Sequence, residues 1–276
     1  MTFLVRLTAS VAAHGPLCVG IDPHPSLLEA WGARGSAAAQ AERLGRDVVA
    51  AAAGRVAVVK PQVALFEALG SAGVAALERV LADARAAGLV VIADAKRGDI
   101  GSTNLGYAAA WLAPGSPLEA DALTVSPYLG VGALDPLFEA AERAGKGLFV
   151  LAATSNPEAA AVQLARVPDG RTIAAAVAAA VAERNAVTGA GHGLVIGATV
   201  DRAAFGLAAP GLSRDASTPV LAPGFGAQGA RLADLRSLFP EDRLVLASAS
   251  RSILQPGPDG VAAAIDAAVA ELAAAR

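Results

Sequence analysis

The chain has 276 residues, a formal net charge of −3 and a hydrophobic content of 54%, much of it alanine. Its length suits a single α/β barrel, which typically has about 250 residues. The small negative charge argues against a nucleic acid or a membrane surface as partner. The single cysteine, Cys18, excludes an intrachain disulfide and fits a reducing compartment. With no secretory signal pattern and no apolar stretch near the ~20 residues that span a bilayer, we expect a cytoplasmic protein.

Short apolar runs alternate with helical stretches along the chain. Eight runs are almost continuously apolar, as strands covered on both faces are: 17–21, 56–59, 89–93, 122–125, 148–152, 194–196, 220–221 and 244–247. Helices are predicted between them, for example over 73–87, 134–144, 172–185 and 260–275. The stretches 23–35 and 205–219 are predicted to be irregular loops. Eight such units favour a (β/α)8 TIM barrel, with residues 1–276 as one domain.

The ten residues from Asp94 to Thr103 read DAKRGDIGST and follow the predicted strand 89–93. Side chains alternate along a strand, so Asp94 and Lys96 are expected to share a face. Glycines on both sides of Asp99 permit a tight loop, and Ser102 or Thr103 is expected to cap the next helix. Barrels carry their chemistry at the carboxyl ends of strands, which favours a functional site here. The alternative is a surface cluster of ion pairs.

Lys60 ends the second predicted strand and precedes a proline, so we expect it to point into the barrel mouth. A buried lysine needs a partner, and Asp94 on the adjacent strand is the natural one. The alternative is a structural salt bridge, which perturbs pKa values without catalysing anything. Asp22 follows the first strand. His24 is interpreted as an ordinary loop histidine, with a place at the border of the site as the alternative.

The last two strand ends fit a phosphate site. The seventh predicted strand is followed by PGFGAQG (223–229), and the eighth by SASRS, which contains Arg251. Barrels often bind phosphate with these two loops. Glycines let backbone N–H groups approach an anion, and an arginine fork matches phosphate oxygens. No metal site is predicted, because the three histidines are dispersed and lack near histidine or cysteine partners. Nucleotide-cofactor glycine patterns are not seen after a strand either.

Taken together, these residues resemble the orotidine 5′-phosphate decarboxylase family over nearly the whole chain. The centre of the resemblance is the D-x-K-x-x-D pattern of Asp94, Lys96 and Asp99. The strings VGIDP (19–23), VKPQ (59–62), TSNP (154–157) and PGFGAQG (223–229) add to it. DAKRGDIGST and TSNP are similar to the longer branch of the family, which is common in actinobacteria. Sister barrels that act on sugar phosphates share D-x-K-x-x-D, whereas its combination with Lys60 is specific.

The resemblance implies that orotidine 5′-phosphate loses CO₂ from C6 and gains a proton there, with no cofactor and no metal. Lys96 would be the proton donor and would stabilise the C6 carbanion. Asp94 would sit near the departing carboxylate, and Lys60 would orient Asp94 and contact the ribose. Asp99 would complete the charged set from the other subunit of a homodimer with shared active sites.

The resemblance also implies the substrate contacts. Asp22 would accept a ribose hydroxyl, and Ser155 would hold the pyrimidine. Ile100 and Thr103 would enter with Asp99 from the partner subunit. Gln228 and Arg251 would hold the phosphate. Ser250 would add a backbone contact to it, although many members of the family have glycine at this position.

Two alternatives stay open. One is a sister enzyme, a sugar-phosphate decarboxylase or a hexulose-phosphate synthase or aldolase-type barrel. Those enzymes typically place an acid near the second strand and bind Mg²⁺, whereas Lys60 occupies that region here. The other is a catalytically inactive barrel that binds a phosphorylated ligand as a sensor. Retention of all four charged residues argues against it, but a shared barrel fixes the fold and not the reaction.

Overall fold

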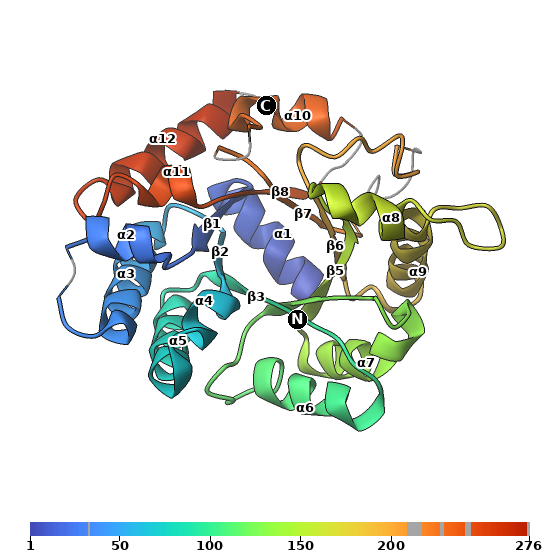
Figure 1. Ribbon diagram of the computed structural model, residues 1–276, viewed down its shortest axis with the longest axis horizontal. Helices are drawn as coiled ribbons and strands as arrows, with labels where there is room; N and C mark the ends of the chain where they lie inside the picture. Colours follow the sequence, from blue (N-terminus) through green and yellow to red (C-terminus); the bar gives the residue numbers. More distant parts are fainter. Residues whose placement is uncertain (33, 209–216, 227–228, 241–243, 275–276) are drawn as a thin grey trace.

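The computed structural model describes residues 1–32, 34–208, 217–226, 229–240 and 244–274. In them, eight parallel strands close into a barrel in chain order, which confirms the predicted fold (Figure 1). The strands are β1 (Leu17–Ile21), β2 (Val58–Pro61), β3 (Val90–Arg97), β4 (Ala122–Val125), β5 (Gly147–Ala153), β6 (Gly193–Ile196), β7 (Val220–Pro223) and β8 (Val245–Ala249). Each predicted run overlaps a strand, but β2, β7 and β8 continue two residues beyond their predicted ends, and β3 continues four residues beyond, through Arg97.

Helix α1 (Phe3–His14) lies at one end of the barrel, and the later helices surround the barrel on its outer face. These are α2 (Pro25–Ala30), α3 (Ala37–Ala52), α4 (Val63–Glu67), α5 (Gly70–Ala86), α6 (Gly101–Trp111), α7 (Asp135–Ala144), α8 (Ala160–Gln163), α9 (Ile173–Thr188), α10 (Leu235–Leu238), α11 (Arg251–Leu254) and α12 (Val261–Ala274). Short 3-10 turns span Val131–Leu134, Pro157–Ala159 and Leu232–Asp234. None of the described helices is long and apolar enough to cross a membrane.

Two local predictions were wrong. The expected loop 23–35 contains α2, which begins at Pro25, a residue whose fixed φ suits the first helical position. The expected cap by Ser102 or Thr103 does not form, because α6 already begins at Gly101 and its N-cap position is Ile100, without a side-chain bond. The described residues between β6 and β7 form turns and no helix, which agrees with the irregular loop predicted over 205–219 in its described part.

Helix α1 closes one end of the barrel, and no helix had been predicted there. In Figure 1 it lies across the middle of the ring of strands. Phe3 and Leu7 are buried with the interior side chains of the strands, and the Phe3 ring packs edge-on against Phe149 at 6.1 Å. Burying one such side chain contributes about 1.5–3 kcal/mol. Arg6 of α1 also pairs with Asp121 at 2.8 Å, just before β4. A ligand must therefore enter from the opposite end, where the strands finish.

Candidate active site

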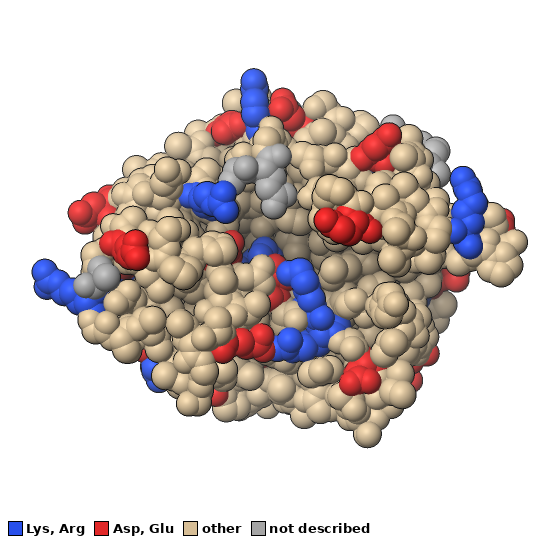
Figure 2. Space-filling view, viewed as in Figure 1, with Lys and Arg blue, Asp and Glu red and all other residues tan. Residues whose placement is uncertain are grey.

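A cavity of about 370 Å³ lies at the carboxyl ends of the strands. Figure 2 shows the hollow, with acidic and basic side chains meeting inside it. Six of the predicted site residues line it: Asp22, Lys60, Asp94, Lys96, Ser250 and Arg251. The size is within the range of small-molecule sites. Apolar side chains of β5, β6 and β7 complete the wall, namely Leu151, Val195 and Leu221.

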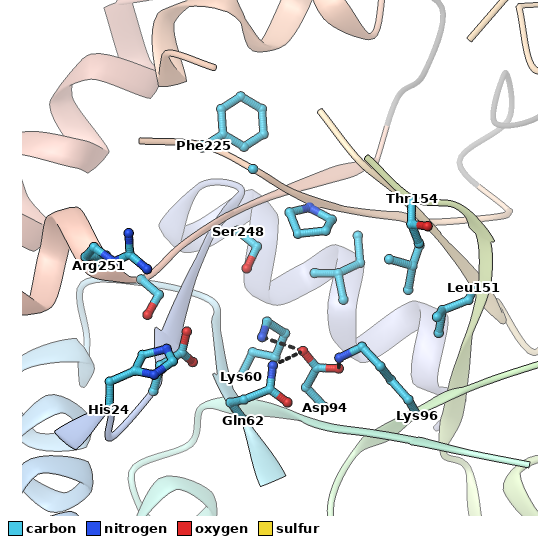
Figure 3. Close-up of a pocket in the computed structure, with 16 residues that line it drawn as sticks. His24, Lys60, Gln62, Asp94, Lys96, Leu151, Thr154, Phe225, Ser248 and Arg251 are labelled. Carbon is cyan, nitrogen blue, oxygen red and sulfur yellow. Dashed lines mark hydrogen bonds and ion pairs between the residues drawn. The ribbon is translucent and has the colours of Figure 1, made fainter. Parts of the chain in front are cut away.

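Four side chains converge on the carboxylate of Asp94, and Figure 3 shows Lys60, Gln62 and Lys96 among them. Lys60 Nζ and Gln62 Nε2 donate to Oδ2, at 2.8 and 3.1 Å. Lys96 Nζ and the Thr124 hydroxyl donate to Oδ1, at 2.6 and 3.0 Å. A carboxylate has about four lone-pair sites, so its capacity as an acceptor is filled. The orientation of Asp94 is therefore fixed by three neighbouring strands.

The charges of this cluster support one another. Burial alone would raise the pKa of the Asp94 carboxyl, but the lysines Lys60 and Lys96 outweigh it and hold that pKa well below its usual value. Burial alone would lower the pKa of Lys60, but Asp94 and then Asp22 outweigh it and raise that pKa above its usual value. Asp94 is therefore a carboxylate and Lys60 an ammonium at neutral pH.

The two lysines differ in access to the cavity. The side chain of Lys60 is only 7% exposed, whereas that of Lys96 is 46% exposed. Lys60 is thus placed to hold Asp94, and Lys96 is placed to meet a ligand. No cluster of three His, Cys, Asp or Glu side chains that could hold a metal ion occurs in the described part of the chain.

The backbone at Lys96 is unusual. Its φ is +49°, and no other non-glycine residue among those described has a positive φ. A left-handed conformation costs an L-residue about 1–2 kcal/mol. It arises in a bulge: β3 and β4 pair at Ala93 with Leu123 and again at Arg97 with Val125, so β3 carries two extra residues. Asp94 and Lys96 do meet, as predicted, but through this bulge and not through regular alternation.

Asp22 and Ser250 lie at the ends of β1 and β8, on either side of Gly20. Asp22 Oδ1 and Ser250 Oγ are buried and have no hydrogen-bond partner among the described residues. A side chain at Gly20 would put its Cβ 2.6 Å from Ser250 Cβ, so glycine is required for this close approach. An unsatisfied buried polar group costs about 1–3 kcal/mol. A ligand hydroxyl at this place would satisfy both atoms.

Arg251 marks another side of the cavity. It is the first residue of α11, directly after β8. Figure 3 shows Arg251 and His24 together at one side, away from Lys96 and from Leu151 and Thr154. His24 therefore borders the cavity, which was the less favoured of its two interpretations. Gly224 and Phe225 of the glycine-rich loop also line the cavity, whereas Gln228 lies outside the described residues.

Four predicted residues do not line the cavity of this single chain. Asp99 and Ile100 lie on the turn between β3 and α6, and Thr103 lies in the first turn of α6; Ile100 is 62% exposed. The buried Asn104 fixes this turn, since its side chain accepts a hydrogen bond from Asp99 N at 3.0 Å and donates to the Asp99 carbonyl. Ser155 is exposed, next to Thr154, which does line the cavity. The roles of these four residues stay predictions.

Sequence reasoning missed the site role of several polar residues. Gln62 stands two residues beyond Lys60, in the quoted VKPQ string, and the alternation rule could have placed it beside Asp94. Thr154 and Ser248 follow or end predicted strands, which was a usable signal. Thr124 gave no such signal, because a threonine inside an apolar strand is explained by β propensity alone.

Comparison with known proteins identifies the family. The family model for "Orotidine 5′-phosphate decarboxylase / HUMPS family" matches residues 15–266. An orotidine 5′-phosphate decarboxylase of Salinispora tropica is 53% identical over 266 residues, 95% of this chain and 92% of the relative. One of Streptomyces coelicolor is 50% identical over 261 residues, 93% and 91% of the two chains. The solved structure of Leishmania donovani OMP decarboxylase is 29% identical, with a TM-score of 0.78, and the match covers 100% of this chain and 98% of that one. The chain therefore belongs to the orotidine 5′-phosphate decarboxylase / HUMPS family.

Proposed function

We propose that this chain is an orotidine 5′-phosphate decarboxylase, which forms uridine 5′-phosphate and CO₂ in the last step of de novo UMP synthesis. The observation that carries the proposal is the ionised Asp94, held between Lys60 and Lys96 at the cavity. Relatives of about 50% identity that match over nearly the whole chain carry this name. We place the enzyme in the cytoplasm, where its buried thiol stays reduced.

Lys96 is proposed to carry the chemical step. The bond from C6 to the carboxylate breaks, its electron pair stays on C6, and a proton from Lys96 Nζ forms the new C–H bond. A carbanion at this vinylic carbon has no resonance sink, so a positioned ammonium must stabilise it. Asp94, fixed beside Lys96, would lie near the departing carboxylate and would hold the ammonium in place. Solvent then returns the proton to Lys96, which is the more exposed of the two lysines.

The rest of the cavity is proposed to bind the remote parts of the substrate. Arg251 would hold the phosphate by its guanidinium fork, with Gln228 and the Ser250 backbone beside it. Asp22, whose Oδ1 has no partner in the part of the chain that the structure describes, would accept a ribose hydroxyl. Ser155 would hold the pyrimidine. Binding energy from the phosphate, far from C6, can then be used to order the charged cluster.

The competing reactions are separated by one experiment. Purified protein is given orotidine 5′-phosphate, and loss of the near-ultraviolet absorbance of the orotate ring is followed. A hexulose phosphate and a sugar-acid phosphate serve as parallel substrates, each with and without Mg²⁺. We expect turnover of the orotidine substrate alone. Turnover only of a sugar phosphate would establish the sister-enzyme alternative, and binding without turnover of any substrate would establish the sensor.

We also infer that the chain forms a homodimer with shared active sites. Large apolar side chains are exposed near the ends of β3 and β4, namely Ile100, Leu105, Tyr128 and Leu129. Tyr128 is 80% exposed. Because β3 and β4 are neighbouring strands, the segments that follow them lie at the same rim of the barrel, and exposed apolar side chains gathered there favour an interface. A two-fold interface here would bring the turn that carries Asp99 to the partner's cavity.

Subunit exchange tests whether each active site is built from both subunits. Lys96→Ala and Asp99→Ala are mixed one to one after each is shown to be inactive. If Asp99 acts in the partner's site, half the dimers are mixed and each has one intact site, so roughly a quarter of wild-type activity returns. No recovery, with exchange demonstrated by a mass-tagged subunit, would mean that Asp99 serves its own barrel.

A further inference from the structure

The hydroxyl of Thr124 joins the two halves of the charged cluster. Its oxygen accepts a 2.9 Å hydrogen bond from the backbone N–H of Lys96 and donates a 3.0 Å hydrogen bond to Oδ1 of Asp94. The side chain is buried, on β4. Oδ1 is also the oxygen that receives Lys96 Nζ at 2.6 Å. One hydroxyl thus contacts both the backbone of the proposed proton donor and the carboxylate that holds its ammonium.

The directions of these two bonds follow from chemistry. A backbone N–H can only donate and a carboxylate can only accept, so the single hydroxyl hydrogen must point to Asp94. The hydroxyl therefore acts as acceptor on one side and uses its single hydrogen as donor on the other. An apolar side chain of the same shape could make neither bond.

The hydroxyl is needed because of the bulge in β3. The two extra residues of β3 between the flanking pairs interrupt the ladder with β4. In a regular parallel pair the Lys96 N–H would find a carbonyl, but here the Thr124 side chain accepts it. The left-handed backbone of Lys96 persists only if its surroundings hold it in place.

We propose that Thr124 is a positioning residue for the decarboxylation: it holds Lys96 in its left-handed conformation and locks the Asp94 carboxylate toward it. The inference rests on the proposed function. Without the hydroxyl, the Lys96 backbone loses the partner that fixes it, and Nζ is no longer held in line with C6. The ribose and phosphate contacts proposed for Asp22 and Arg251, which also line the cavity, do not involve Thr124 and should stay as they are.

Thr124→Val and Thr124→Ser test the role. Valine keeps the branched shape and removes the hydroxyl, and serine keeps the hydroxyl. We expect Thr124→Val to lower kcat by about 10- to 100-fold, since a displacement near 1 Å costs a rate of this order. KM for orotidine 5′-phosphate and Kd for uridine 5′-phosphate should change less than about threefold, and Thr124→Ser should keep kcat within about threefold of wild type.

Thr218→Val is the matched control. Thr218 is also buried, and its hydroxyl accepts from Asn185 at 3.0 Å, outside the cavity. This variant should keep kcat, whatever it does to Tm. The inference is overturned if Thr124→Val keeps kcat within twofold of wild type, if serine fails to rescue, or if KM and Kd rise as much as kcat falls. If Thr124→Val does not fold, Thr124→Ala replaces it. Failure of both to fold would give Thr124 a structural role and would overturn the inference as well. Absence of turnover by the wild-type chain refutes the proposed function instead.

Discussion

Lys60 Nζ lies 2.8 Å from Oδ2 of Asp94, and both side chains are almost fully buried, at 7% and 10% exposure. Taking two charges out of water is expensive, and their attraction repays that cost only when further hydrogen bonds satisfy them. Asp94 receives three such bonds from Gln62, Lys96 and Thr124. The pair joins the neighbouring strands β2 and β3 at the cavity. It therefore fixes an ionised carboxylate at a defined point of the site.

Lys60→Met should destabilise the protein by about 3–5 kcal/mol, because it leaves the Asp94 charge buried with one cation fewer. Adding Asp94→Asn to this variant should recover part of that stability, since the uncompensated charge is gone. It should not recover activity. Urea unfolding of the two single variants and the double variant measures the coupling. Strictly additive losses of stability would contradict the pairing.

Arg251→Ala should lower kcat/KM for orotidine 5′-phosphate by about 10- to 150-fold, because charge-assisted bonds of this kind contribute about 1.5–3 kcal/mol each. Orotidine, which has no phosphate, should be affected less than about twofold. Steady-state kinetics on both substrates makes the comparison. An equal loss on both would show that Arg251 supports the fold and not the phosphate.

Removal of metal ions should leave kcat unchanged. The positive charges beside Asp94 come from Lys60 and Lys96, in the region where sister barrels would place a divalent cation. Dialysis against EDTA, followed by assays with and without added Mg²⁺, tests this expectation. Loss of activity that Mg²⁺ restores would favour the sister-enzyme alternative.

The barrel should lose stability as the pH is lowered, because of His192. Burial lowers the pKa of this imidazole from 6.5 to about 4, although Glu142 opposes the effect from 3.2 Å. The unfolded chain then binds more protons than the folded one below pH 6.5. Stability from this residue is complete above pH 6.5 and is lost as pH falls toward 4, by about 3 kcal/mol. Tm is measured by melting at several pH values, and plots of Tm against pH for wild type and His192→Gln should differ in slope over this range. Parallel pH profiles would refute the assignment.

The strands were predictable because a barrel buries both faces of its sheet, which makes each strand a short apolar run. The bounds of β1 and β4 followed directly. The partnership of Lys60 with Asp94 was predictable as well, since a lysine at the end of a buried strand needs a carboxylate. Helix α1 was missed although Phe3 and Leu7 have helical spacing, because a helix that plugs a barrel has no counterpart in the β/α alternation.

The details of the site could not be predicted in the same way. The bulge at Lys96 depends on the register between β3 and β4, which no local pattern encodes, so the role of Thr124 appeared only in three dimensions. The two unsatisfied atoms of Asp22 and Ser250 depend on the close approach of β1 and β8 at Gly20. The role proposed for Asp99 involves a second chain, which the sequence of one chain does not describe, and Gln228 lies outside the described residues.

The central claim is that Lys96 donates the proton to C6, and Lys96→Ala tests it most directly. Single-turnover decarboxylation of orotidine 5′-phosphate is measured for this variant and for wild type, together with Kd for uridine 5′-phosphate and Tm. The account predicts a loss of rate beyond the ~10²–10⁴ of general acid catalysis alone, because a transition-state charge is lost as well, with the fold and product binding largely intact. A variant that kept a tenth of the wild-type rate would contradict the account.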